Sequence, residues 1–106
     1  MITINIADQF SRYPAGRYQT DGPYSGEFFR NKYLVPALKE PNNDKIVVNL
    51  DGARGYGSSF LEEAFGGLVR MGFNKETIKS KMEILAKDSS LKIEILDYID
   101  KAIPAT

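Results

Sequence analysis

The sequence contains neither cysteine nor histidine. Without cysteine there is no disulfide, no thiolate metal ligand and no cysteine nucleophile. Without histidine there is no Ser-His-Asp triad, and the usual proton-transfer group near neutral pH is missing. A metal site would depend on carboxylates alone, and no regular spacing of Asp and Glu suggests one. We therefore expect no metal, no cofactor and no enzymatic activity.

Net charge is also missing, because 14 Lys and Arg balance 14 Asp and Glu. No overall field favours nucleic acid or an anionic membrane. The first ten residues lack the basic start and long apolar run of a signal peptide. No apolar run approaches the roughly 20 residues needed to cross a bilayer. We expect a cytoplasmic protein with neither a nucleic-acid nor a membrane partner.

The remaining patterns fit a single α/β domain over residues 1–106. Three strands are predicted, at 2–6, at 45–50 as an interior strand covered on both faces, and at 81–86. Four helices are predicted, at 25–38, 59–71, 74–78 and 89–102. Their predicted caps are Ser25 for the first, Asn74 for the third, and Ser89 or Ser90 for the last. Pro36 is expected to kink the first helix or to start a second segment, and Gly72 is expected to end the second helix. The segment 8–24 is predicted to be irregular, with Arg17–Thr20 as a candidate short strand. We predict a mixed or parallel sheet of about four strands, with helices packed mainly on one side.

The most informative stretch is a strand–loop–helix unit. The loop Asp51–Gly57 contains three glycines and joins the end of a strand to the start of a helix, where α/β proteins often bind ligands. It matches neither a Walker A motif nor GxGxxG, so glycines that permit a tight turn explain it better than a nucleotide site does. Ser59 and Glu62 match a capping box. Gly66-Gly67 inside the helix indicates tight packing or a flat docking patch, because each interior glycine costs about 0.8–1.0 kcal/mol relative to alanine.

Arginine and tyrosine gather in the segment 11–24, and both are favoured at protein interfaces. Such a mixture can also stack single-stranded nucleic acid, which the neutral net charge disfavours. The plainer interpretation is a loop held to its own domain by ion pairs from arginine to Glu27, Glu62 or Glu63.

Residues 47–70, VVNLDGARGYGSSFLEEAFGGLVR, resemble the central segment of STAS domains, which occur in anti-sigma factor antagonists and sulphate transporters. GSSFLEEAFGGLVR at 57–70 and SRYPAGRYQTDGPYSGEFFR at 11–30 resemble more closely the small STAS-like proteins of unknown function. The resemblance implies a STAS-like fold and a bacterial type of regulatory module. In the antagonists, an unphosphorylated STAS domain captures a histidine-kinase-like ATPase, and phosphorylation of the serine at the helix start releases it.

Carried to this chain, the resemblance implies partner switching, with Ser58 as the phosphorylated residue. The bland alternative is that Ser58 is an ordinary loop residue and Ser59 a helix cap. Our leading hypothesis is a non-enzymatic module that binds a protein partner through the surface 51–63 and the segment 11–24. The candidate partner-binding residues are Arg12, Arg17, Tyr18, Arg54, Tyr56, Ser58, Ser59, Glu62 and Glu63.

Two alternatives stay open. The first is a small-molecule or anion sensor that uses the glycine loop, Arg54 and the free amides of the helix start. The second is an enzyme with Asp51, Glu62 or Glu63 as acid and base, although no pair has a spacing that identifies a reaction.

Overall fold

The computed structural model describes residues 1–105, in which short strands alternate with helical segments. The strands are β1 (Ile2–Asn5), β2 (Ile46–Asn49) and β3 (Met82–Leu85). The helices are α1 (Gly26–Phe29), α2 (Val35–Lys39), α3 (Ser58–Leu61), α4 (Gly67–Arg70), α5 (Lys75–Lys81) and α6 (Ser89–Lys101). Wider π-type turns lie at Ile6–Phe10, Arg30–Leu34 and Glu62–Gly66, and one 3-10 turn lies at Gln19–Asp21. Two of the π-type turns join α1 to α2 and α3 to α4 without a break, which gives continuous helices over residues 26–39 and 58–70.

The sheet is fully parallel, in the order β1-β2-β3. The predicted α/β fold and the parallel alternative are confirmed, whereas the mixed alternative is not. The sheet has three strands within residues 1–105, so the prediction of about four strands is not confirmed. The candidate strand Arg17–Thr20 is wrong, because a 3-10 turn occupies Gln19–Asp21 instead. Side chains fix that turn: the Asp21 carboxylate accepts the amides of Arg17 and Tyr18, and Glu27 accepts the amide of Gln19.

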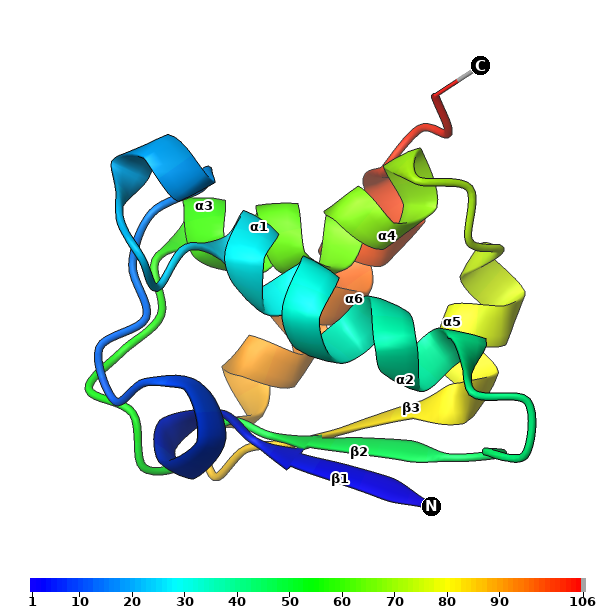
Figure 1. Cartoon of the computed structure of the whole chain (residues 1–106), viewed down its shortest axis with the longest axis horizontal. Helices are drawn as coiled ribbons and strands as arrows, with labels where there is room; N and C mark the ends of the chain where they lie inside the picture. Colours follow the sequence, from blue (N-terminus) through cyan, green and yellow to red (C-terminus); the bar gives the residue numbers. More distant parts are fainter. Residues whose placement is uncertain (106) are drawn as a thin grey trace.

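The helices α1 to α6 lie on one face of the sheet and form a helix layer over it (Figure 1). Ile4, Val48 and Ile84 are aligned across the three strands and are buried beneath that layer. The prediction that β2 is covered on both faces is therefore wrong. Val47 points to the uncovered face and is nevertheless buried, because Thr3 and Glu83 flank it in the register.

The helix over residues 26–39 begins as predicted, with the Ser25 side chain accepting the amide of Phe28. Pro36 neither breaks it nor starts a separate helix. The π-type turn Arg30–Leu34 comes just before Pro36 and ends with the Val35 amide bonded to the Arg30 carbonyl. This widening accommodates a residue that has no amide proton to donate.

The helix over residues 58–70 begins one residue earlier than predicted. Gly57 is its cap residue and Ser59 lies inside the first turn, so the predicted capping box does not form. The carboxylate of Glu62, which the box requires, is bonded to arginines instead. The predicted end is confirmed, since Gly72 has φ +106 and the Phe73 amide returns to the Leu68 carbonyl.

The later elements follow the predictions closely. Asn74 caps α5, which extends to Lys81. α6 is capped by Asp88 rather than by Ser89 or Ser90, because the Asp88 carboxylate accepts the Ser90 amide. No helix within residues 1–105 is long and apolar enough to span a membrane.

Candidate functional site

The loop between β2 and the 58–70 helix is held by side-chain contacts to the backbone. The Asn49 carboxamide oxygen accepts the Asp51 amide at 2.9 Å, and the Asp51 carboxylate accepts the Lys87 amide at 2.9 Å. The Tyr56 hydroxyl donates to the Leu50 carbonyl at 2.7 Å. Burial raises the pKa of Tyr56 well above its usual range, and the Asp51 carboxylate adds to the rise. Tyr56 is therefore an internal anchor of the loop.

The same loop is joined to the segment 11–24. The Arg54 amide donates to the Arg12 carbonyl at 2.8 Å, which sets the two backbones side by side. Both arginine side chains are exposed and form no ion pair within residues 1–105. The neighbouring Tyr13 ring is 63% exposed. Two segments about 40 residues apart in sequence thus form one basic and aromatic edge.

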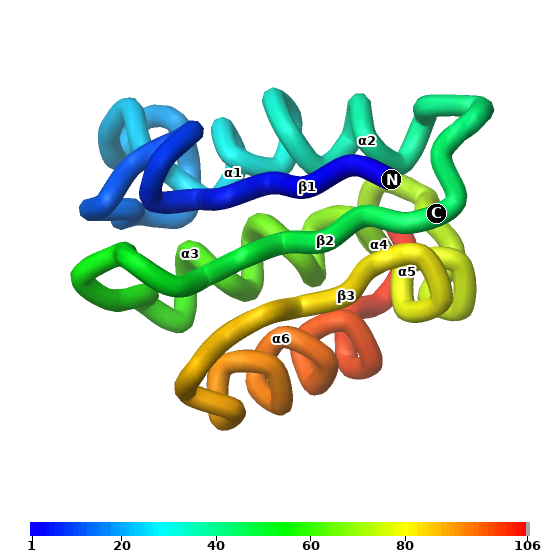
Figure 2. Tube along the Cα trace, turned by 90° about the horizontal axis from the view of Figure 1, so that it is seen from below, coloured from blue at the N-terminus to red at the C-terminus, as the bar shows by residue number. Residues whose placement is uncertain are grey.

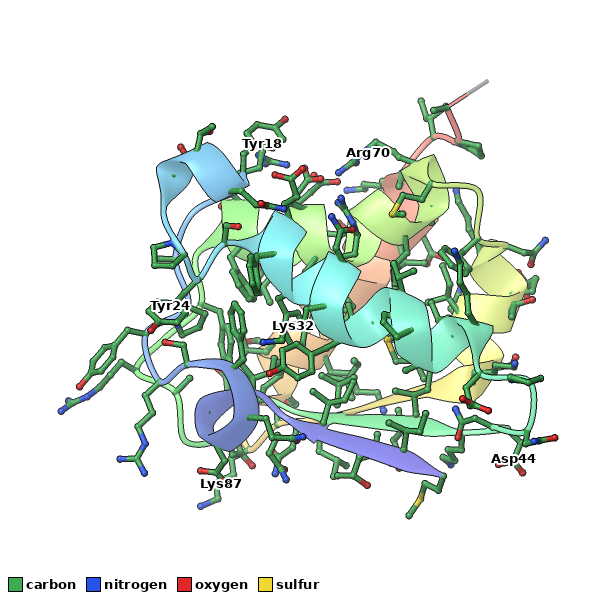
Figure 3. The ribbon with its side chains drawn as sticks, viewed as in Figure 1. Tyr18, Tyr24, Lys32, Asp44, Arg70 and Lys87 are labelled. Carbon is green, nitrogen blue, oxygen red and sulfur yellow. The ribbon has the colours of Figure 1, made fainter. Side chains whose placement is uncertain are left out.

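A second junction between these segments is a cluster of five charged side chains, which we call the charged cluster: Arg17, Arg30, Glu62, Glu63 and Arg70. Arg70 binds Glu62 through two hydrogen bonds of 2.7 and 3.0 Å, and Arg17 reaches both Glu62 and Glu63. Figure 3 shows Tyr18 and Arg70 on the same side of the molecule, with charged side chains between them. Of the three predicted partners for arginine of the 11–24 segment, Glu62 and Glu63 are confirmed. Glu27 accepts the Gln19 amide instead and forms no ion pair within residues 1–105.

The innermost pair of the cluster is buried. Arg30 and Glu63 are each 7% exposed, and the Arg30 guanidinium also donates to the Glu63 carbonyl at 3.1 Å. The Arg30 side chain lies against Gly67, where an added Cβ would come closer than 3.0 Å to it. The interior glycine is thus explained by the passage of a buried arginine, which supports packing over an open docking patch.

The cluster also fixes the ionisation of Glu62. Hydrogen bonds from Arg70 hold the pKa of Glu62 below its usual range, although partial burial opposes this, and Arg17 lowers it further. A carboxylate held ionised by two arginines is poorly suited to donate a proton. The charged cluster as a whole carries one net positive charge, because it contains three arginines and two glutamates.

Ser58 is exposed at the first turn of the 58–70 helix, and Ser59 beside it is half-buried. The Ser58 side chain lies close to the hydroxyl of Tyr98 on α6. A hydrogen bond to Glu94 at 2.6 Å raises the pKa of Tyr98 to about 12, and the Ser58 hydroxyl opposes the rise. The surroundings of Ser58 therefore include a carboxylate on α6.

The structure separates the predicted site residues into three groups. Arg12, Arg54, Tyr18 and Ser58 are exposed. Arg17 and Glu62 are partly exposed and paired, while Glu63 is buried in the charged cluster. Tyr56 and Ser59 are half-buried within the loop and the first helical turn.

Sequence reasoning missed Arg30 and Gly26. A Cβ on Gly26 would come closer than 3.0 Å to the Phe60 carbonyl, so this glycine lets the 26–39 and 58–70 helices pack closely. The signal that could have pointed to Arg30 is the Gly66-Gly67 pair, which indicated a close approach to the helix by tight packing or by a docked partner. Nothing in the pattern named the crossing side chain.

The model of the STAS-like domain of unknown function (DUF4325) matches residues 25–92, more than half of the chain. The chain belongs to this family. No curated protein and no solved structure gives a significant match.

The match of this STAS-like domain spans the 26–39 helix, β2, the loop and the 58–70 helix. It includes all of the 57–70 motif on which the resemblance rested. It leaves out β1 and the whole of the Arg- and Tyr-rich segment 11–24. The surface formed jointly by the loop and that segment is therefore only half contained in the family match.

Proposed function

We propose that this STAS-like domain is a non-enzymatic protein-interaction module, and that a partner binds the exposed edge where the loop 51–57 meets the segment 11–24. We call this edge the docking surface and define it by Arg12, Tyr13, Tyr18, Arg54 and Ser58. The observation that carries the proposal is the double junction of the two segments. The Arg54–Arg12 backbone bond and the Arg17–Glu62 ion pair order both segments, yet leave these five side chains exposed.

Ordering before binding favours recognition. A loop that is already held loses less conformational freedom when a partner docks. Arginine and tyrosine are the side chains most enriched at binding hot spots, because they combine large contact area with directed hydrogen bonds. Arg12 and Arg54 have no carboxylate partner among residues 1–105, so the complementary surface is expected to be acidic.

The family resemblance suggests the class of partner, a histidine-kinase-like ATPase, and Ser58 as its control point. Ser58 is exposed, as a kinase substrate must be. A phosphate on it would add about 1.5–2 negative charges close to Glu94 and Glu62 and to the exposed Arg54 loop. Repulsion by an acidic partner surface would then release the partner.

Affinity capture tests this function, with the purified domain as bait in an extract of the cells in which the protein naturally occurs. We expect wild type and Ser58→Ala to retain an ATPase of this class, and Ser58→Asp and Arg54→Glu to lose it. Ser59→Asp is the matched control, because it places the same charge on the half-buried neighbour. Capture that is equal for all the folded variants would contradict the proposed surface.

The anion-sensor alternative has weaker support. A cavity of about 410 Å³ lies at the ends of β2 and β3, where α/β sheets bind ligands, but two carboxylates, Asp51 and Asp88, line it together with Lys87. Arg54 is not among its lining residues. A thermal-shift screen with phosphate, nucleotides and organic anions tests this alternative, since a ligand at 100 times its Kd adds about 2.7 kcal/mol of stability.

A further inference from the structure

The β1 edge of the sheet is open. The Ile2 amide donates to the carbonyl of Lys45, the residue just before β2, at 2.9 Å. Backbone groups alternate in direction along a strand, so the amides of Ile2 and Ile4 point towards β2 and those of Thr3 and Asn5 point outwards. The side-chain oxygen of Gln9 accepts the outward amide of Asn5 at 2.6 Å. Thr3 is left with an outward amide and carbonyl that have no partner within residues 1–105.

The helix layer is wider than the sheet beneath it. Packed helices lie about 8–10 Å apart, whereas neighbouring strands lie about 4.8 Å apart. The axes of three helices over three strands therefore overhang each edge by about 3–5 Å, close to the spacing of one further strand. Figure 2, seen from the uncovered face of the sheet, shows the 26–39 helix displaced outwards beyond β1.

A groove of about 280 Å³ lies under this overhang. Its strand side is Ile2, Thr3 and Ile4, and its helix side is apolar at Tyr33, Pro36 and Ala37. The Tyr33 hydroxyl donates to the Gln9 carbonyl at 2.6 Å, which holds the ring in place. The groove thus offers backbone hydrogen-bonding groups on one wall and apolar surface on the other.

Opposite charges line the two ends of the groove. Lys32 lies on the helix towards the carboxyl end of β1, and Glu40 lies towards its amino end, because the helix runs opposite to β1 (Figure 1). Neither side chain forms an ion pair within residues 1–105. Lys32 rests only over the rings of Phe28 and Tyr33, with its Nζ 5.7 and 5.6 Å from the ring centroids.

From these observations we infer that the β1 edge binds one extended segment of a partner protein, which adds a fourth strand beneath the 26–39 helix. The segment has alternating apolar side chains, an acidic residue near Lys32 and a basic residue near Glu40. Strand addition of this kind takes affinity from backbone hydrogen bonds and specificity from alternate side chains. This site is separate from the docking surface of the proposed function, and either can fail without the other.

A second copy of the chain fits the edge poorly. Antiparallel pairing of two β1 strands would place each overhanging helix above the strand of the other copy. The two helix axes would then lie at most about 5 Å apart, closer than the 8–10 Å that packed helices require. A lone strand brings no helix of its own and meets no such obstacle.

The test uses a fluorescein-labelled peptide, Glu-Val-Thr-Val-Thr-Val-Lys, measured by fluorescence anisotropy with the full chain. We expect binding in which the Thr3 amide becomes protected from hydrogen exchange. Thr3→Pro removes the outward amide without touching the bonds to β2, and proline is tolerated at a strand edge. We expect at least about tenfold weaker binding for Thr3→Pro, since the variant loses one hydrogen bond and its ring obstructs the edge.

The matched control is Thr3→Val, which changes the side chain on the uncovered face and keeps the backbone amide. Its affinity is expected to stay within about twofold of wild type, and Lys32→Glu is expected to weaken binding. Three results would overturn the inference: no binding at about 1 mM peptide, equal binding to folded Thr3→Pro, or a dimer in light scattering that Thr3→Pro abolishes. The last result would assign the edge to a second copy.

Discussion

Removing the charge of Glu63 is expected to destabilise the domain severely. Glu63 and Arg30 are each 7% exposed, and Glu63→Leu leaves the Arg30 guanidinium buried with only the residue-63 carbonyl and the Asn31 side chain as acceptors. Breaking a buried ion pair by removing one partner costs about 3–5 kcal/mol, because the other charge stays uncompensated. Arg30→Met is expected to cost less, since Glu63 keeps contacts of 3.3 Å to both Arg17 and Arg70.

Urea denaturation and thermal unfolding measure this effect. For a domain of about 100 residues, 1 kcal/mol corresponds to about 4–5 °C, so Glu63→Leu is expected to lower Tm by about 12–25 °C. Glu62→Gln is the matched control. The Glu62 side chain accepts as many arginine hydrogen bonds as the Glu63 side chain does, three each, but it is 23% exposed, and partly exposed pairs contribute about 0.2–1 kcal/mol. A Glu63→Leu loss no larger than that of Glu62→Gln would refute the reasoning, because burial would then not decide the cost.

The remaining predictions concern the same helix and its neighbours. Gly67→Ala is expected to destabilise the domain by about 1–2 kcal/mol in urea titrations, because the added Cβ would overlap Arg30. At an unobstructed helix position alanine would instead be preferred over glycine by about 1 kcal/mol. Gly55→Ala is the control, because no atom lies within 4 Å of the Cβ that it adds. Gly57→Asp is expected to stabilise the domain by about 0.5–1 kcal/mol, because Gly57 caps the helix at φ −71 and has free space around it. Ser59→Ala is expected to leave stability nearly unchanged. A large loss of stability in Ser59→Ala with no gain in Gly57→Asp would restore Ser59 as the cap. The pKa of Glu62 is lower in the folded state than its ordinary value of 4.5, so its ion pairs contribute full stability above pH 4.5. This stability is lost as the pH falls through the pKa of the folded state. Glu62→Gln should therefore flatten the acid limb of a stability–pH profile. The raised pKa of Tyr98 acts in the opposite sense: its contribution is present below pH 10 and is lost as the pH rises towards about 12, a slope that Tyr98→Phe should remove.

The order of the strands and helices could be predicted because hydrophobic period and turn residues report local structure directly. The strand alternation at Ile2–Asn5, the Gly72 terminus and the Ser25 and Asn74 caps all needed only neighbours within a few positions. The face on which β2 is covered could not be read from its apolar run. Val47 is buried by its strand neighbours rather than by a second helix layer.

The predictions for the site were partly right and partly wrong, because the fold decides which of several possible partners a charged side chain contacts. Pairing of Arg17 with Glu62 was predictable because a loop rich in arginine faced a helix start rich in glutamate. The competing use of Glu62 in a capping box was also predicted, and only the fold decides between a backbone amide and two guanidinium groups. Arg30 was missed because a buried arginine carries no local signature: its partner is 33 positions away.

The central claim is that two segments distant in sequence form one docking surface. Hydrogen–deuterium exchange of the domain with and without its captured partner tests this claim most directly. We predict that residues 11–18 and 51–59 become protected together, and that Arg54→Glu removes both protections at once. Protection confined to one of these segments, or found only elsewhere on the domain, would contradict the account.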